Sequence, residues 1–182
     1  MSKLIIFGIM MVLITFISWR TLFNTKSHGF PRYFAWICMA WLFASNYKFW
    51  FVNPFEWNQL ISWVLLIYSA YLVIAGILLI KFIGKPNASR KEENLFGFEK
   101  TTKLIDTGVF KYTRHPLYGS LIFLTWAILL KNPTLLLTII ALLSTILLYI
   151  TSRYDEKECI QYFGFAYENY MKRTKMFIPF IF

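Results

Sequence analysis

Charged residues are scarce in this chain, and acidic residues are scarcer than basic ones. Only 15% of the 182 residues are charged, with nine Asp and Glu against 19 Lys and Arg, whereas soluble domains average about 25% charged residues. Hydrophobic residues make up 58% of the chain and aromatic residues 20%. This composition argues against a soluble globular core and predicts a single integral membrane domain.

Residues that form disulfides and metal sites are also few. Cys38 lies within an uncharged run and Cys159 lies beyond the last one, so a disulfide framework is not expected. The two histidines are His28 and His115, and a protein metal site takes more ligands than these residues supply. We therefore predict that the protein holds no metal.

Five uncharged segments reach or approach the length of about 20 residues that a helix needs to cross a bilayer. They predict an all-α integral membrane protein with about five transmembrane helices. The last two helices are separated only by the turn Lys131-Asn132-Pro133, with the new helix expected to start at Pro133, so they are expected to form a hairpin. The segments are residues 4–19, 33–47, 57–80, 116–130 and 132–152.

The chain divides into two parts within one domain. Residues 1–83 hold three spans, and residues 84–182 hold the helical hairpin 116–152 and a C-terminal segment. Apolar residues recur in that segment at spacings of three and four, which predicts an amphipathic C-terminal helix interrupted near Gly164. These residues are Ile160, Phe163, Tyr167 and Tyr170.

The net charge of +10 is unevenly distributed along the chain. All 19 Lys and Arg residues except Lys3, Lys48 and Lys131 fall in segments that five spans would place on one side. Because basic residues collect on the cytosolic side of membranes, we expect the N-terminus outside and the C-terminus in the cytosol, with residues 84–113 and 153–182 cytosolic. The basic excess then requires no nucleic-acid partner.

A cluster of polar groups precedes the fourth span. Residues 108–118 read GVFKYTRHPLY, and Pro116 predicts a helix start because proline is favoured at the first helical position. Arg114, His115 and the Tyr118 hydroxyl lie there beside free backbone N–H groups that favour an anion. These residues alone leave two interpretations open, a ligand site and a set of interfacial anchors.

A second polar cluster follows the fifth span and contains Arg153, Asp155 and Glu156. A hairpin brings its entry and exit to the same membrane face. His115 and N–H donors could then bind a carboxylate, while the acidic residues could bind an ammonium group. The charge pattern by itself favours the alternative, in which these residues are a solvated helix end.

Together the two clusters resemble a known family. Residues 108–118 resemble the signature G-x-Y/F-x-x-x-R-H-P-x-Y of the isoprenylcysteine carboxyl methyltransferase family, which belongs with the membrane phospholipid methyltransferases. Residues 155–170, DEKECIQYFGFAYENY, resemble its second motif, E-E-x-x-L-x-x-x-F-G-x-x-Y-x-x-Y. Ile178-Pro179 also fits the family pattern, and the resemblance covers roughly residues 100–180.

The resemblance implies that S-adenosyl-L-methionine is the methyl donor and binds at the cytosolic face within residues 84–182. Thr151 stands where the family has a substrate-facing Arg, so Arg114 and Arg153 are the candidates for orienting the acceptor. Asp155 replaces the usual Glu, and Glu156 is a second candidate for the acidic role. The implied cofactor-binding residues are Lys103, Leu104, Ile105, Phe110, His115, Tyr118, Asp155 and Glu156.

The short fourth span bears on the acceptor. Its fifteen residues would extend about 22 Å at a rise of about 1.5 Å per residue, less than a hydrocarbon core of about 30 Å. The reacting centre should then lie near the headgroup level, open to a lipophilic acceptor with a carboxylate, thiol or amine headgroup. Two alternatives remain, an NADPH-dependent membrane reductase of the sterol type and a non-enzymatic membrane scaffold.

Overall fold

The computed structural model describes residues 1–87 and 96–181, and these residues form six α-helices without a β-strand. The predicted all-α fold is therefore confirmed for the described part of the chain. One isolated bridge pairs Thr113 with Lys175. The helices are α1 (Ser2–Leu22), α2 (Gly29–Asn46), α3 (Trp57–Leu79), α4 (Pro116–Leu129), α5 (Leu135–Phe163) and α6 (Phe165–Arg173).

Among the described residues, three helices are long and apolar enough to cross a membrane. These are α1, α5, and the combination of α3 with the π-helical turn Ile80–Gly84, which extends α3. Helix α4 is apolar but has only 14 residues, and α2 has 18. The expectation of five spans thus remains a prediction for α2 and α4.

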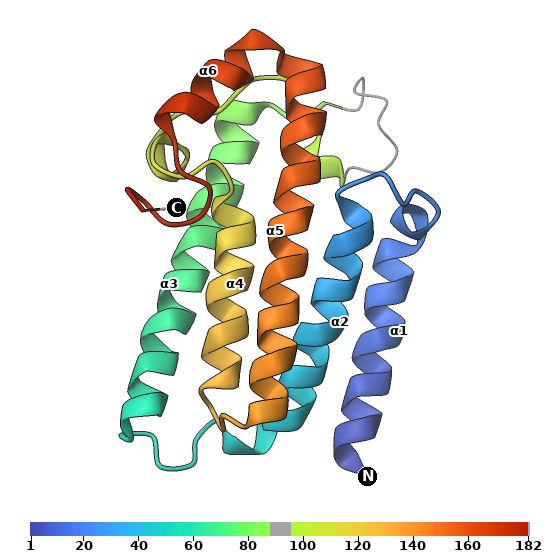
Figure 1. Ribbon diagram of the computed structural model, residues 1–182, viewed down its shortest axis with the longest axis vertical. Helices are drawn as coiled ribbons and strands as arrows, with labels where there is room; N and C mark the ends of the chain where they lie inside the picture. Colours follow the sequence, from blue (N-terminus) through green and yellow to red (C-terminus); the bar gives the residue numbers. More distant parts are fainter. Residues whose placement is uncertain (88–95, 182) are drawn as a thin grey trace.

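The five longer helices run side by side along the long axis of the molecule, and α6 lies across one end (Figure 1). Neighbouring helices pack in the order α3, α4, α5, α2 and α1, and α2 also contacts α4. Residues 88–95 of the predicted polar connection and Phe182 lie outside the described residues. Because α4 and α5 are adjacent and antiparallel, the polar groups before α4 and near the end of α5 come to the same end of the bundle.

Small and hydroxyl-bearing residues bring α3 close to α4. Ser62 Oγ donates a hydrogen bond to the Ala127 carbonyl at 2.7 Å, and Ser69 Oγ donates to the Ser120 carbonyl at 2.8 Å. A Cβ atom at Gly76 would lie 2.9 Å from the Leu117 side chain. Small residues of this kind let helix backbones approach closely in apolar surroundings, and here they place the start of α4 against α3.

The helix boundaries near the hairpin agree closely with the sequence. Helix α4 begins at Pro116 as predicted, and α5 begins at Leu135 rather than at Pro133. The reason is that Thr134 caps α5 and its hydroxyl accepts the N–H of Leu137. Helix α5 ends where Gly164 adopts a φ of +58°, a conformation that side chains disfavour.

Candidate functional site

A cavity of about 490 Å³ lies at the end of the bundle where α4 begins. Its polar wall includes Arg32 from α2, Glu99 from the connection before α4, His115, and Asp155 from α5. Apolar residues of α1, α2, α3 and α4 line the rest. Helices α2 and α3 lie on opposite flanks of the α4–α5 pair (Figure 1), so both flanks contribute residues to the lining of the cavity.

Seven of the eight residues expected to bind the cofactor line this one cavity. Glu156 is the exception. Residues that are up to 52 positions apart in the chain thus meet at one place because the hairpin brings its two ends together. The seven residues are Lys103, Leu104, Ile105, Phe110, His115, Tyr118 and Asp155.

Both the backbone and the side chain of His115 contact segments that lie later in the chain. It is the N-cap of α4, and its backbone N–H donates to the Met176 carbonyl at 3.1 Å. Its side chain is buried, with Nδ1 3.4 Å from Asp155 Oδ2 and Nε2 3.5 Å from Glu156 Oε1. Burial favours the neutral ring, but these two carboxylates outweigh it and raise the pKa of His115. Nε2 makes no hydrogen bond within the described residues.

Asp155 and Glu156 occupy different environments because consecutive helical residues point about 100° apart. Asp155 faces the cavity together with Cys159, one turn further along α5. Glu156 is only 2% exposed and accepts hydrogen bonds from Arg114 Nε and from Arg153 Nη1, the latter at 2.7 Å. The geometry therefore gives Asp155 access to a ligand in the cavity and leaves Glu156 as the partner of two arginines.

The two arginines expected to orient the acceptor also separate. Arg114 lines the cavity, and its Nη1 donates to the Thr174 carbonyl at 2.7 Å. Arg153 does not line the cavity, and its side chain is 51% exposed on another face of α5. Arg153 lies two residues before Asp155, about 200° around a helix from the residue that faces the cavity, which accounts for this placement.

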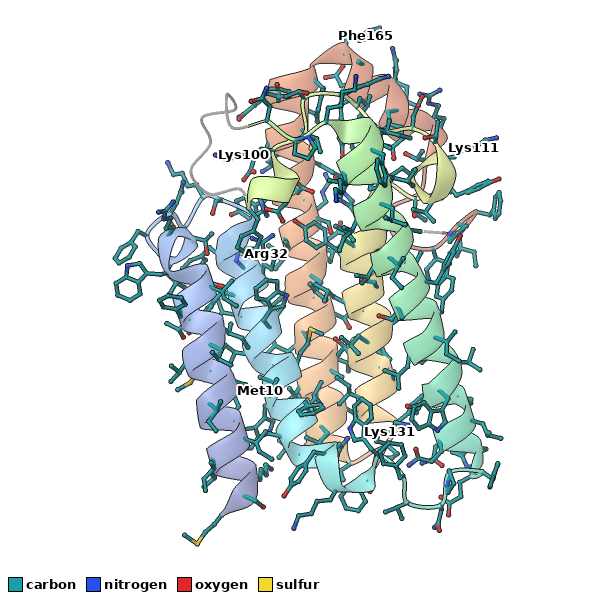
Figure 2. The ribbon with its side chains drawn as sticks, turned by 180° about the vertical axis from the view of Figure 1, so that it is seen from behind. Met10, Arg32, Lys100, Lys111, Lys131 and Phe165 are labelled. Atoms are coloured by element: carbon teal, nitrogen blue, oxygen red, sulfur yellow. The ribbon has the colours of Figure 1, made fainter. Side chains whose placement is uncertain are left out.

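Further charged residues reach the site from connections between the predicted spans. His28 and Arg32 lie between the first and second predicted spans, and Glu99 lies between the third and fourth. His28 Nδ1 lies 2.7 Å from Glu158 Oε2, and its Nε2 lies 3.6 Å from Glu99 Oε2. Arg32 Nη1 donates to Glu99 Oε1. Figure 2 labels Arg32 toward one end of the helical bundle and Lys131 toward the other end. His28 and Arg32 thus anchor the start of α2 to α5 and to the connection before α4.

Burial and ion pairing act in opposite directions on this cluster. Burial disfavours the charged imidazole of His28, but hydrogen bonds to Glu158 and Glu99 dominate and raise its pKa to about 10. Burial also disfavours ionised Glu99, whereas His28 and Arg32 hold its pKa below the usual range. At neutral pH the cluster therefore consists of charged residues in mutual contact.

His28, Asp155 and Glu158 place one potential metal-ligand atom each within 4.8 Å of the others. His28 Nδ1 pairs with Glu158 Oε2 at 2.7 Å, and Asp155 Oδ2 lies 3.4 Å from His115 Nδ1. Each of the two carboxylates thus already has a histidine partner. The expectation that the protein holds no metal stays a prediction.

Aromatic rings surround the charged groups. Trp36 stacks on Phe96 with ring centroids 6.2 Å apart, and the Arg32 guanidinium lies 4.5 Å from the Phe96 centroid. The Tyr170 hydroxyl donates to the Phe110 carbonyl at 2.6 Å and ties α6 to the motif segment. Aromatic faces next to carboxylates suit a ligand that carries a positive centre.

Comparison with known proteins identifies the family of this chain. The family model described as phospholipid methyltransferase matches residues 57–165, more than half of the chain. The chain belongs to this family. The resemblance noted in residues 108–118 and 155–170 is thereby confirmed at the level of the family, which includes the isoprenylcysteine carboxyl methyltransferase type.

Two curated relatives of this chain are both named methanethiol S-methyltransferase. The protein from Pseudomonas deceptionensis is 34% identical over 71 residues, 39% of this chain and 26% of the relative. The protein from Crocosphaera subtropica is 32% identical over 72 residues, 40% of this chain and 28% of the relative. The match thus spans about a quarter of each relative's length. No solved structure gives a significant match.

The family match begins at α3 and therefore leaves out α1 and α2. His28 and Arg32 lie in the part of the chain that the family model does not cover. His28 and Glu158 are 130 residues apart in the chain, and no local motif links them. The available signal in the sequence was a histidine and an arginine at the edge of an uncharged run, a pattern that membrane anchors share.

Proposed function

We propose that this protein is an S-adenosyl-L-methionine-dependent methyltransferase that acts at the cytosolic membrane face on a lipophilic acceptor. Membership of the phospholipid methyltransferase family supports methyl transfer. The observation that carries the rest is a cavity lined both by charged side chains of both signs and by many apolar side chains. Such a cavity suits a charged donor that meets an apolar acceptor.

The residues present fit the donor in size and charge. Binding pockets for small ligands usually measure about 300–1,000 Å³, and this cavity of about 490 Å³ lies within that range. Asp155 is suited to the donor's ammonium group, and Arg32 and His115 to its carboxylate. Nε2 of His115 is a buried polar atom that makes no hydrogen bond to the described residues, so a ligand could satisfy it.

The donor, when bound, supplies an already activated methyl group. The residues of this chain then need to orient the acceptor and exclude water. His115, fixed by the Met176 carbonyl and by Asp155, provides a rigid polar end to the cavity. A thiolate or carboxylate acceptor requires no general base once it is ionised, and the loss of charge in the reaction is favoured by low-dielectric surroundings.

The apolar part of the cavity supports an acceptor that enters from the bilayer. It is lined by Trp36 of α2, Val73 and Ile77 of α3, and Leu121 of α4. The curated relatives are named for methanethiol, a small thiol that partitions into membranes. We therefore favour a thiol among the acceptor headgroups. The distribution of basic residues supports placing the N-terminus outside and the C-terminus in the cytosol.

The first test distinguishes the donor. Thermal unfolding in detergent should shift upward with S-adenosylhomocysteine and not with NADPH. The His115→Ala variant should lose about 1–3 kcal/mol of S-adenosylhomocysteine affinity, the scale of a buried or charged hydrogen bond. Stabilisation by NADPH alone would support a sterol-type reductase, and stabilisation by neither ligand would support a scaffold.

The second test concerns the acceptor. A series of alkyl thiols that begins with methanethiol should show kcat/KM rising with chain length if acceptors enter from the bilayer. Methyl transfer would be followed with a radiolabelled donor in reconstituted vesicles. A flat series, or activity restricted to a hydrophilic thiol, would contradict entry from the bilayer and leave the donor assignment intact.

A further inference from the structure

A second hollow of about 440 Å³ lies outside the methyl-transfer cavity, between α5 and the segment that follows α6. Five of the ten residues that line it are basic, and the others include Tyr149 of α5 and Ile181 near the C-terminus. Arg114 is shared by the hollow and the cavity. The five basic residues are Arg114, Arg153, Lys172, Arg173 and Lys175.

The positive charge of this basic hollow is only partly neutralised. Glu156 pairs with both Arg114 and Arg153, and Asp106 pairs with Arg173 at 2.7 Å. Lys172 contacts the neutral side chain of Asn169. Among the described residues, neither Lys172 nor Lys175 forms an ion pair. The hollow therefore retains a net positive charge that an anionic ligand would complement.

Exposed apolar side chains adjoin the hollow. Tyr149 of α5 is 41% exposed, and Ile178, Phe180 and Ile181 after α6 are 39%, 80% and 75% exposed. The C-terminal segment turns back from α6 along the bundle (Figure 1). Basic groups beside exposed apolar groups fit the boundary between lipid headgroups and acyl chains, where long basic side chains reach toward phosphates.

We propose that this basic hollow binds the phosphate of an anionic phospholipid, with Arg153, Lys172 and Lys175 as its contacts. The acyl chains would lie along Tyr149 and Ile181. The orientation of the hollow toward the cytosolic leaflet rests on the proposed function, whereas the choice of ligand rests on charge and apolar exposure. Arg153 is thereby assigned to lipid binding, in keeping with its absence from the methyl-transfer cavity.

The test measures lipid binding on the full chain in detergent. Thermal unfolding is followed during titration with phosphatidylglycerol and with phosphatidylcholine of the same acyl chains. Phosphatidylglycerol should stabilise the protein at lower concentration. The double variant Lys172→Gln/Lys175→Gln should weaken its apparent affinity at least tenfold, because each basic residue near an anionic headgroup contributes about a factor of five.

The matched control is Lys111→Gln/Lys157→Gln, which removes the same charge from exposed lysines outside the hollow. It should keep the wild-type preference for phosphatidylglycerol. Equal loss in both double variants would indicate a diffuse charge effect and overturn the site. Equal stabilisation by soluble glycerol 3-phosphate would overturn the lipid assignment. Stabilisation by S-adenosylhomocysteine, measured in parallel, reports on the proposed function separately.

Discussion

The two ends of α4 both bury polar side chains, but they satisfy them differently. Beyond the C-terminal end, Lys131 is 2% exposed, its Nζ donates to Gln59 Oε1 at 3.0 Å, and it lies 3.7 Å from the Trp63 ring centroid. Gln59 in turn donates to the Lys131 carbonyl at 3.0 Å. At the N-terminal end, His115 and Asp155 are in contact but also line the cavity.

This difference shows that a buried charge does not by itself mark a site. Lys131 and Gln59 form hydrogen bonds with each other and do not line the cavity, so they are best explained as a structural contact that joins α3 to the α4–α5 turn. Within the described part of the chain, His115 keeps a buried nitrogen without a hydrogen bond beside a cavity with charges of both signs. The second arrangement is the one that a polar ligand can complete.

The largest expected effect separates Glu156 from Asp155 at the site end. Glu156→Gln should lower the free energy of unfolding by about 3–5 kcal/mol, because it leaves Arg114 without its buried anionic partner. Asp155→Asn should instead lower S-adenosylhomocysteine affinity by about 10–100-fold, the scale of a lost charged hydrogen bond. Thermal unfolding and calorimetric titration measure the two effects.

The pair of variants also tests the assignment of the ammonium group. Each measurement uses the folded fraction, so that loss of stability in Glu156→Gln is not counted as loss of affinity. Unchanged affinity in both variants would show that neither carboxylate binds the donor. A greater loss of affinity in Glu156→Gln than in Asp155→Asn would contradict the geometric distinction between them.

A smaller effect is expected at the opposite end. Lys131→Met should lower the free energy of unfolding by about 1–3 kcal/mol, because Gln59 Oε1 loses its buried donor. It should leave S-adenosylhomocysteine affinity unchanged. Lys48→Met, which alters an exposed lysine near the same end, serves as the control and should change stability by less than about 0.5 kcal/mol. A loss of ligand affinity in Lys131→Met would break the contrast between the two ends.

A further effect expected at the site end is a dependence of stability on pH through His28. Its pKa of about 10 in the folded protein exceeds the ordinary value of 6.5. The stability it contributes is therefore fully present below about pH 6.5 and is lost as pH rises through 10. The unfolding temperature of the wild type should fall as pH rises over this range, and His28→Gln should flatten this dependence on pH. An unchanged slope would show that Glu99 and Glu158 do not stabilise the imidazolium.

Much of the fold was predictable because its signals are local. The start of α4 at Pro116 and the break at Gly164 each depend on the conformational preference of one residue. The start of α5 was misplaced by two residues because the Thr134 cap competes with Pro133 as a helix signal. The five longer helices were identified from the lengths of uncharged runs. This signal is also local, because helix formation and burial in lipid depend on contiguous sequence.

The candidate site was predictable only where a motif marked it. Residues 108–118 and 155–170 carried recognisable patterns, and their hairpin connection implied that they meet. His28, Arg32 and Glu99 had no such pattern. Their contacts depend on how α2 packs against α5 and on the path of the connection before α4, and both result from long-range packing.

By itself, the sequence determined that the chain is helical, that its charges concentrate outside the apolar runs, and that two motifs flank a hairpin. Each of these features follows from residues close together in the chain. Only the tertiary structure decided that Asp155 faces the cavity while Glu156 binds two arginines, and that Arg153 points to a different hollow. The physical reason is that neighbouring residues on one helix face different surroundings, and those surroundings are supplied by segments distant in sequence.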